Sequence, residues 1–200
     1  MGIAYLIIGY AFGWIEGALL ISYIFGKFDI RNKGSGNAGA SNITVIMGWK
    51  YGFLVALIDI LKAFIPMTVA KFTLNASFTQ IFILGFGVVI GHIYPLPFKF
   101  KGGKGAASFV GFSYALDFRL GLFMNILIIS LTIVTDYIFI GTLCMFFTLP
   151  IILVYFKAPS LTVLLSLVIA VISLIKHIPN IKNLKNGKET GLRSTVKKNK

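Results

Sequence analysis

Long stretches of apolar residues are the feature that most constrains how this chain can fold. We predict seven of them, at residues 4–25, 52–73, 77–94, 104–117, 119–135, 137–156 and 159–176. A helix of about 20 apolar residues is long enough to cross the roughly 30 Å hydrocarbon core of a bilayer. The stretch at 77–94 runs into two prolines, which must end its helix, and the stretch at 104–117 is short. The sequence therefore predicts an all-α membrane protein with seven transmembrane helices.

The composition excludes an ordinary soluble domain and narrows the possible chemistry. Of the 200 residues, 57% are apolar and only 12% are charged, whereas soluble domains have about 25% charged residues. Six acidic residues and two histidines make up the acid and base groups of the whole chain. Their spacing forms no metal-ligand set, so the sequence predicts neither a metal nor another cofactor.

The distribution of lysine and arginine predicts the orientation in the membrane. Fifteen of these 19 residues lie in the loop 26–51, in the loop 95–103 with the adjoining residue 104, or after residue 175. By the positive-inside rule, these segments are cytoplasmic. The N-terminus is then outside and the C-terminus inside, which agrees with an odd number of spans.

Two parts follow from this topology. Residues 1–176 form a membrane bundle whose loops 26–51 and 95–103 carry the site, and residues 177–200 form a basic cytoplasmic tail. Within the tail, we expect Lys197, Lys198 and Lys200 to lie against anionic lipid headgroups. The spans show no internal repeat and little charge, which argues against a transporter.

The glycine-rich loop 26–51 is the first candidate site. Gly34, Gly36 and Gly39 match the G-x-G-x-x-G pattern of dinucleotide-binding folds, but a membrane helix precedes them where that fold needs a strand. An anion-binding nest at the start of a helix, beside Arg31 and Lys33, remains possible. A flexible surface loop is the equally weighted alternative.

The second candidate lies at the start of the fourth predicted span. Gly102, Gly103 and Lys104 lie at the N-terminus of that span, where free amides and the helix dipole both favour a phosphate. The segment is not a Walker A loop, because Phe98 and Gly105 stand where that motif needs glycine and serine or threonine. The alternative is a loop whose positive charge serves only topology.

Charged residues within the spans form a third set. Asp59 and Lys62 are three residues apart on one helix and are expected to pair. Glu16 has no evident partner, so it is either protonated or functional. It lies among glycines whose four-residue spacing favours close helix packing, namely Gly9, Gly13 and Gly17.

The last candidate follows the seventh predicted span. His177 and Asn180 lie three residues apart, and Glu189 follows nine residues later. A lone histidine at a helix end is more often a surface residue than a catalyst, unless another part of a site meets it.

Taken in order, these segments resemble the bacterial PlsY family of membrane glycerol-3-phosphate acyltransferases. The resemblance implies seven spans, an outside N-terminus and transfer of a fatty acyl group from acyl phosphate to glycerol 3-phosphate. The product is lysophosphatidic acid, made at the cytoplasmic face of the bacterial inner membrane. The matching motifs are Gly34-Ser35-Gly36-Asn37-x-Gly39-Ala40-x-Asn42, Asp59-x-x-Lys62, Gly91-His92-x-x-Pro95, residues 100–105, His177-x-x-Asn180-Ile181 and Gly187-x-Glu189.

The resemblance also implies roles for individual residues. Lys104 and the glycine amides hold phosphate, while Ser35 and Asn180 position the substrate hydroxyl and phosphate oxygens. His177 binds substrate or assists proton transfer. The implied catalytic residues are Ser35, Lys104 and His177, and the implied substrate-binding residues are Gly34, Gly36, Asn37, Gly102, Gly103, Asn180 and Glu189. The implied partners are the two substrates and membrane lipids, without nucleic acid.

One departure from the family pattern keeps two hypotheses open. Val45 stands where the family usually has arginine, and the next cation is Lys50. Lysine cannot replace the two-pronged geometry with which arginine holds a phosphate. The chain is therefore expected to be an active acyltransferase of this type or, alternatively, a catalytically impaired relative that binds an anionic lipid or phosphorylated ligand.

Overall fold

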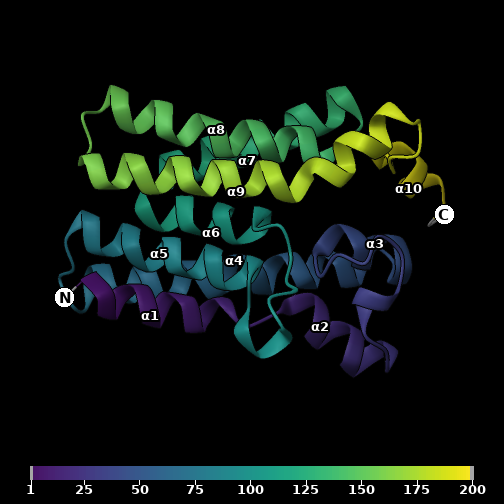
Figure 1. Ribbon diagram of the computed structural model, residues 1–200, viewed down its shortest axis with the longest axis horizontal. Helices are drawn as coiled ribbons and strands as arrows, with labels where there is room; N and C mark the ends of the chain where they lie inside the picture. Colours follow the sequence, from purple (N-terminus) through teal and green to yellow (C-terminus); the bar gives the residue numbers. More distant parts are fainter. Residues whose placement is uncertain (1, 199–200) are drawn as a thin grey trace. The chain divides into compact units, whose positions relative to one another are not determined.

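The computed structural model describes residues 2–198, with side chains up to residue 195, and its regular structure over that range is entirely helical (Figure 1). It divides into two compact units, Met1–Gly121 and Leu122–Lys200. The predicted lipid contacts of the tail fall on the Lys197 and Lys198 side chains and on Lys200, which lie outside the described residues.

The first unit contains six α-helices, two 3-10 turns and one π-helical turn within residues 2–116. The α-helices are α1 (Gly2–Gly13), α2 (Gly17–Ile21), α3 (Ala40–Met47), α4 (Trp49–Phe72), α5 (Phe78–Ile93) and α6 (Ala106–Leu116). The π-helical turn is η1 (Ser22–Gly26), and the 3-10 turns are η2 (Ile30–Asn32) and η3 (Leu96–Phe98). The helix α7 (Phe118–Thr135) continues into the second unit, which also contains α8 (Ile138–Tyr155), α9 (Ser160–Lys185) and α10 (Leu192–Lys198).

Six of the seven predicted spans have the length of a membrane crossing. They are Gly2–Gly26, Trp49–Phe72, Phe78–Phe98, Phe118–Thr135, Ile138–Tyr155 and Ser160–Lys185. The stretch predicted at 104–117 is the apolar helix α6, which has 11 residues. At about 1.5 Å per residue, α6 is roughly half as long as the hydrocarbon core is thick. A seventh crossing therefore remains a prediction.

The helices α1 and α5 pack with their backbones in direct contact, and Figure 1 shows them side by side. A Cβ atom on Gly9 would collide with the carbonyl oxygen of Leu84. One on Gly13 would lie 2.5 Å from the carbonyl oxygen of Val88 and 2.6 Å from the Cα of Gly91. Glycines spaced four apart allow helices to approach this closely. The predicted packing role of Gly9 and Gly13 is confirmed.

The interior of the first unit is aromatic, and its outer surface is also apolar. The fully buried rings of Phe82 and Phe112 have centroids 4.9 Å apart, and Phe109 lies 5.5 Å from Phe112. On the outside, large apolar side chains such as Phe53 and Phe72 remain exposed. A protein with apolar groups both inside and outside is suited to a lipid environment.

In the second unit, α9 extends well beyond the predicted end of the seventh span. The prediction ended that span at residue 176, but α9 continues through Pro179 to Lys185. A proline removes one helical hydrogen bond, and here it does not end the helix. The helix ends at Lys185, and Gly187, just beyond the C-cap Asn186, has a φ of +66°, the left-handed conformation common after helix C-termini. His177 and Asn180 therefore lie on α9 itself, which corrects their placement after the span.

Asp136, just beyond the end of α7, fixes the start of α10. Its Oδ1 accepts a hydrogen bond from the Arg193 backbone amide at 2.8 Å, and its carbonyl accepts one from the Leu192 amide at 2.8 Å. These bonds satisfy amides that the first turn of a helix leaves without internal partners. The basic tail is thus attached within the second unit at a defined point.

Candidate functional site

The loop that carries Ser35 is folded around the buried side chain of Asn42. The Asn42 Nδ2 donates hydrogen bonds of 3.0 Å to the carbonyls of Lys33 and Asn37. Its Oδ1 accepts a hydrogen bond of 3.0 Å from the Ser35 amide. Ser35 itself is exposed, and its Oγ is 3.5 Å from the Asn37 amide. Asn42 thereby sets the path of the loop, a role that its place in the motif did not reveal.

Two glycines in this loop are required by its geometry. Gly34 and Gly36 have φ values of +58° and +72°, which favour glycine. A Cβ on Gly34 would also collide with the Asn42 side-chain oxygen. The Gly36 amide donates to the Lys33 carbonyl at 3.0 Å, so it is already committed within the loop. Gly34 and Gly36 therefore shape the loop, and the Gly36 amide is not offered to an anion.

Arg31 ties this loop to the next one. Its guanidinium binds both carboxylate oxygens of Asp29, with the shortest contact at 2.6 Å, and its Nη1 donates to the Phe98 carbonyl at 3.1 Å. The hydrogen bonds from Arg31 hold the pKa of Asp29 below its ordinary value, and the same pairing raises the pKa of Arg31. Arg31 is therefore engaged in structure.

The second loop leads from the end of α5 to α6 and contains Lys104. Lys104 is half-buried and lies two residues before α6 begins, whereas the predicted span began at residue 104. Gly105, with a φ of +87°, turns the chain into the helix. The Gly103 amide donates to the carbonyl of His92 at 3.1 Å, so this amide is committed too. The first-turn amides of α6, which a helix leaves without internal partners, can serve as donors to an anion.

The two loops of the first unit lie against each other. A Cβ on Gly103 would lie 2.6 Å from the carbonyl oxygen of Ala38. The Arg31 guanidinium carbon also lies 5.9 Å from the centre of the Phe98 ring. The segment with Ser35 and Asn37 is thus adjacent to the segment with Gly102, Gly103 and Lys104.

A buried cluster of ionisable side chains lies directly beneath the second loop. The Lys62 Nζ is 2.9 Å from the Asp59 Oδ1, which confirms the predicted pair. The same nitrogen is 2.7 Å from the His92 Nδ1, and Glu16 Oε1 lies 3.3 Å from that Nδ1. This assembly could not be predicted from the sequence, because Glu16 and His92 are 76 positions apart.

In the second unit, His177 is oriented by its own helix. Its Nδ1 lies 2.7 Å from the carbonyl oxygen of Ser173, which can only accept, so Nδ1 carries a proton. In the neutral ring, Nε2 then has the lone pair that a general base needs. Phe139 on α8 stacks against the imidazole, with centroids 6.4 Å apart and planes inclined by 24°. His177 is therefore held rigidly, in a tautomer suited to accept a proton.

Asn180 and Glu189 form a direct pair in the same unit. The Asn180 Nδ2 donates to the Glu189 Oε1 at 2.6 Å. The left-handed turn at Gly187, with the Lys188 amide bonded to the Asn183 carbonyl at 2.8 Å, returns the chain toward α9. Glu189 thus orients the amide of Asn180, a role that depends on the chain reversal.

The structure places Val45 on α3, where it is half-buried. Gly48, with a φ of +96°, ends that helix, and Lys50 belongs to the first turn of α4. Lys50 is thus carried by a different helix from Val45, which leaves it poorly placed to replace an arginine at position 45.

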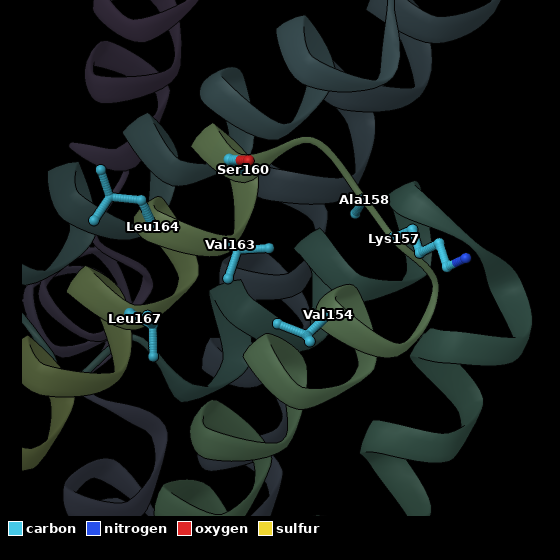
Figure 2. A pocket seen from close by; sticks show the side chains of 7 residues that line it. All are labelled: Val154, Lys157, Ala158, Ser160, Val163, Leu164 and Leu167. Atoms are coloured by element: carbon cyan, nitrogen blue, oxygen red, sulfur yellow. The ribbon is translucent and has the colours of Figure 1, made fainter.

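A groove on the second unit is lined largely by aliphatic side chains. Figure 2 shows it at the turn between α8 and α9, where Lys157 and Ser160 are the polar residues among aliphatic side chains. Its lining consists of Val154, Lys157, Ala158, Ser160, Val163, Leu164 and Leu167. None of the residues that the sequence predicts for the site lines this groove.

Comparison with known proteins gives a consistent result. A family model described as glycerol-3-phosphate acyltransferase matches residues 3–187. Glycerol-3-phosphate acyltransferase 1 of Oceanobacillus iheyensis is 44% identical over 151 residues, which cover 70% of each chain. The glycerol-3-phosphate acyltransferase of Mycoplasma mobile is 38% identical over 76% of this chain and 63% of its own.

Two crystal structures of PlsY (YgiH), an integral membrane glycerol 3-phosphate acyltransferase, are also similar. The glycerol 3-phosphate form has a TM-score of 0.85 and 32% identity, covering 96% of this chain and 95% of the other. The lysophosphatidic acid form has a TM-score of 0.82 and 30% identity, covering 96% of each. The similarity therefore extends over both units.

Proposed function

This chain belongs to the glycerol-3-phosphate acyltransferase family, and from this membership we propose that it makes lysophosphatidic acid by moving a fatty acyl group from acyl phosphate to glycerol 3-phosphate. It is an integral membrane acyltransferase. The observation that supports the residue roles is the adjacency of the Ser35 loop and the Lys104 turn, two segments that are about 70 residues apart in sequence.

The chemistry requires little of the protein beyond positioning. Acyl phosphate is a mixed anhydride with a good leaving group. The hydroxyl oxygen of glycerol 3-phosphate attacks the acyl carbonyl carbon, the bond to the phosphate oxygen breaks, and inorganic phosphate leaves. The hydroxyl proton passes to a base or to the departing phosphate. Holding two anions together and orienting one hydroxyl can supply most of the rate enhancement.

The proposal assigns a role to each group of residues. Lys104 and the first-turn amides of α6 bind a phosphate, and the Ser35 loop positions the substrate hydroxyl. His177, with its proton on Nδ1, accepts the hydroxyl proton at Nε2 or holds the substrate. Asn180, oriented by Glu189, binds substrate oxygens. Support comes from the hydrogen bonds that orient Ser35, His177 and Asn180.

The direct test is an acyl-transfer assay on the purified protein in detergent or vesicles. Long-chain acyl phosphate and glycerol 3-phosphate should yield lysophosphatidic acid, whereas acyl thioester donors should not replace acyl phosphate. A protein that binds glycerol 3-phosphate but forms no product would contradict the proposed activity and favour a binding role.

We also propose that the site faces the cytoplasm of a bacterial cell, with seven crossings and the N-terminus outside. Single cysteines at Asn32 and Lys185, in a variant whose Cys144 is replaced, should react with an impermeant thiol reagent only from the cytoplasmic side. A cysteine at Thr73 should react only from outside. Labelling of Asn32 and Thr73 positions from one side would overturn both the charge argument and the location of the site.

Val45 supports a second candidate function, an impaired relative that binds a phosphorylated ligand. Under this candidate the natural protein turns over slowly, and Val45→Arg raises its rate. A new charge-assisted contact from the arginine to the phosphate would contribute about 1.4 kcal/mol or more, which corresponds to a roughly tenfold higher rate. Steady-state kinetics of the two proteins decide this. A brisk natural enzyme that gains nothing from Val45→Arg rules out the second candidate.

A further inference from the structure

The geometry points to His92 as a positioning residue for the turn at residues 102–104, held in place by a buried quartet of side chains. We define the buried quartet as Glu16, Asp59, Lys62 and His92. The inference rests on the proposed function in one respect, because it concerns the turn that carries the proposed phosphate ligand Lys104.

All four side chains of the buried quartet are almost completely inaccessible. Their exposed fractions are 1% for Glu16, 2% for Asp59, 1% for Lys62 and 3% for His92. They come from three places along the chain: the break before α2, the middle of α4 and the last turn of α5. Ionisable groups at such depth are costly unless they are paired. Lys62 pairs with Asp59 and His92, and Glu16 Oε1 lies 3.3 Å from the His92 Nδ1.

Lys62 is the centre of the buried quartet. Besides Asp59 and His92, its ammonium group donates to the carbonyl of Ile15 at 2.6 Å and lies 3.3 Å from that of Gly13. These carbonyls belong to the break at the end of α1. Three ammonium protons therefore already have partners, and Lys62 holds α1, α4 and α5 together at one level.

Lys62 also determines which nitrogen of His92 carries the ring proton. Because an ammonium group can only donate, the His92 Nδ1 accepts at 2.7 Å and the ring proton lies on Nε2. Glu16 lies beside the same ring, and both of its carboxyl oxygens are buried without a hydrogen-bond partner. The side chains of Lys62 and Glu16 thus flank the imidazole on its Nδ1 side.

The opposite edge of His92 supports the turn. A Cβ on Gly103 would collide with the His92 Nε2, and one on Gly102 would collide with the His92 carbonyl oxygen. A Cβ on Gly102 would also lie 3.0 Å from the Glu16 Oε1. The Gly103 amide is bonded to the His92 carbonyl at 3.1 Å. The turn lies directly on His92, and Lys104 is the next residue.

The contact between His92 and Gly103 should affect substrate binding, which mere stabilisation of the bundle would not do. If the imidazole is removed, Gly103 loses its support and the backbone that carries Lys104 can move. A displacement of about 1 Å at a positioning group can cost up to roughly a hundredfold in rate or affinity. The loss should appear mainly in the binding of the phosphate substrate, because the reacting groups elsewhere are untouched.

A double-mutant cycle tests this inference. His92→Ala and Gly103→Ala should each raise the KM for glycerol 3-phosphate about tenfold while kcat changes less than about threefold. In the double variant, Gly103→Ala should raise KM less than it does alone, because the missing ring makes room for the new methyl group. The matched control is Ser113→Ala, a buried serine of α6 outside the turn. Fully additive effects, or a natural KM in His92→Ala, would overturn the inference.

Two further measurements keep the inference testable if the cycle is compromised. If His92→Ala does not fold, His92→Asn keeps an acceptor for Lys62 and should restore folding but not the natural KM. If the natural protein shows no turnover at all, the proposed function fails. Hydrogen exchange of the amides at 101–105 then decides the inference on its own, since His92→Asn should exchange faster than the natural protein. Unchanged exchange would contradict it.

Discussion

Lys104→Ala is expected to reduce the affinity for the anionic substrate by roughly tenfold to more than a hundredfold while leaving the membrane fold intact. The range corresponds to the loss of one charge-assisted contact of about 1.5–3 kcal/mol. Lys104 lies two residues before the first turn of α6, where helix amides already favour a phosphate, so its charge adds to a preformed site. Titration of the purified variant with glycerol 3-phosphate measures the loss directly.

Lys101→Ala is the matched control, because it removes the same charge from an exposed position of the same loop. A loss of affinity equal to that of Lys104→Ala would mean that the loop attracts anions by total charge. Binding and rate within twofold of the natural protein in Lys104→Ala would show that this lysine serves only topology.

Asn42→Ala should reduce turnover roughly tenfold or more, because it removes the side chain around which the Ser35 loop is folded. The change leaves the Ser35 amide and the Lys33 and Asn37 carbonyls without their partner. Each buried polar group left unsatisfied costs about 1–3 kcal/mol, which the loop avoids by changing conformation. Steady-state kinetics together with thermal unfolding in detergent separate this local effect from loss of the fold.

The control for this prediction is Asn32→Ala, which removes the same kind of side chain from an exposed position of the loop. Asn42→Asp adds a graded comparison, since it keeps the acceptor for the Ser35 amide and loses the two donors. Its activity should fall between those of the natural protein and Asn42→Ala. Natural turnover in Asn42→Ala would mean that Ser35 does not depend on this scaffold.

The long helices could be predicted from the sequence because lipid demands apolar side chains along the whole length of a span. The end of α9 could not, since beyond residue 176 the sequence becomes polar while the helix continues past Pro179. The loop positions of Ser35 and Lys104 followed from the motifs and topology. The partners that orient them, Asn42 and His92, depend on the path of the folded chain.

The sequence also could not predict which backbone amides of the glycine-rich segments are available to bind an anion. A row of small residues indicates that the backbone can approach an anion, but not which N–H groups are already in use. The structure shows that the Gly36 and Gly103 amides are bonded within the protein. Sequence patterns can therefore suggest a phosphate site without identifying which amides would serve as its donors.

The contact between α1 and α5 limits how this protein can change over evolutionary time. In an ordinary core, a larger side chain on one helix can be accommodated by a smaller one opposite it. Here a Cβ on Gly13 would lie 2.6 Å from the Cα of Gly91, and a Cβ on Gly87 would lie 2.6 Å from the Leu6 carbonyl oxygen. The atoms that face these glycines belong to the backbone, so no smaller side chain on the opposite helix could make room for a larger residue. A substitution at these glycines can be tolerated only if the two helices move apart.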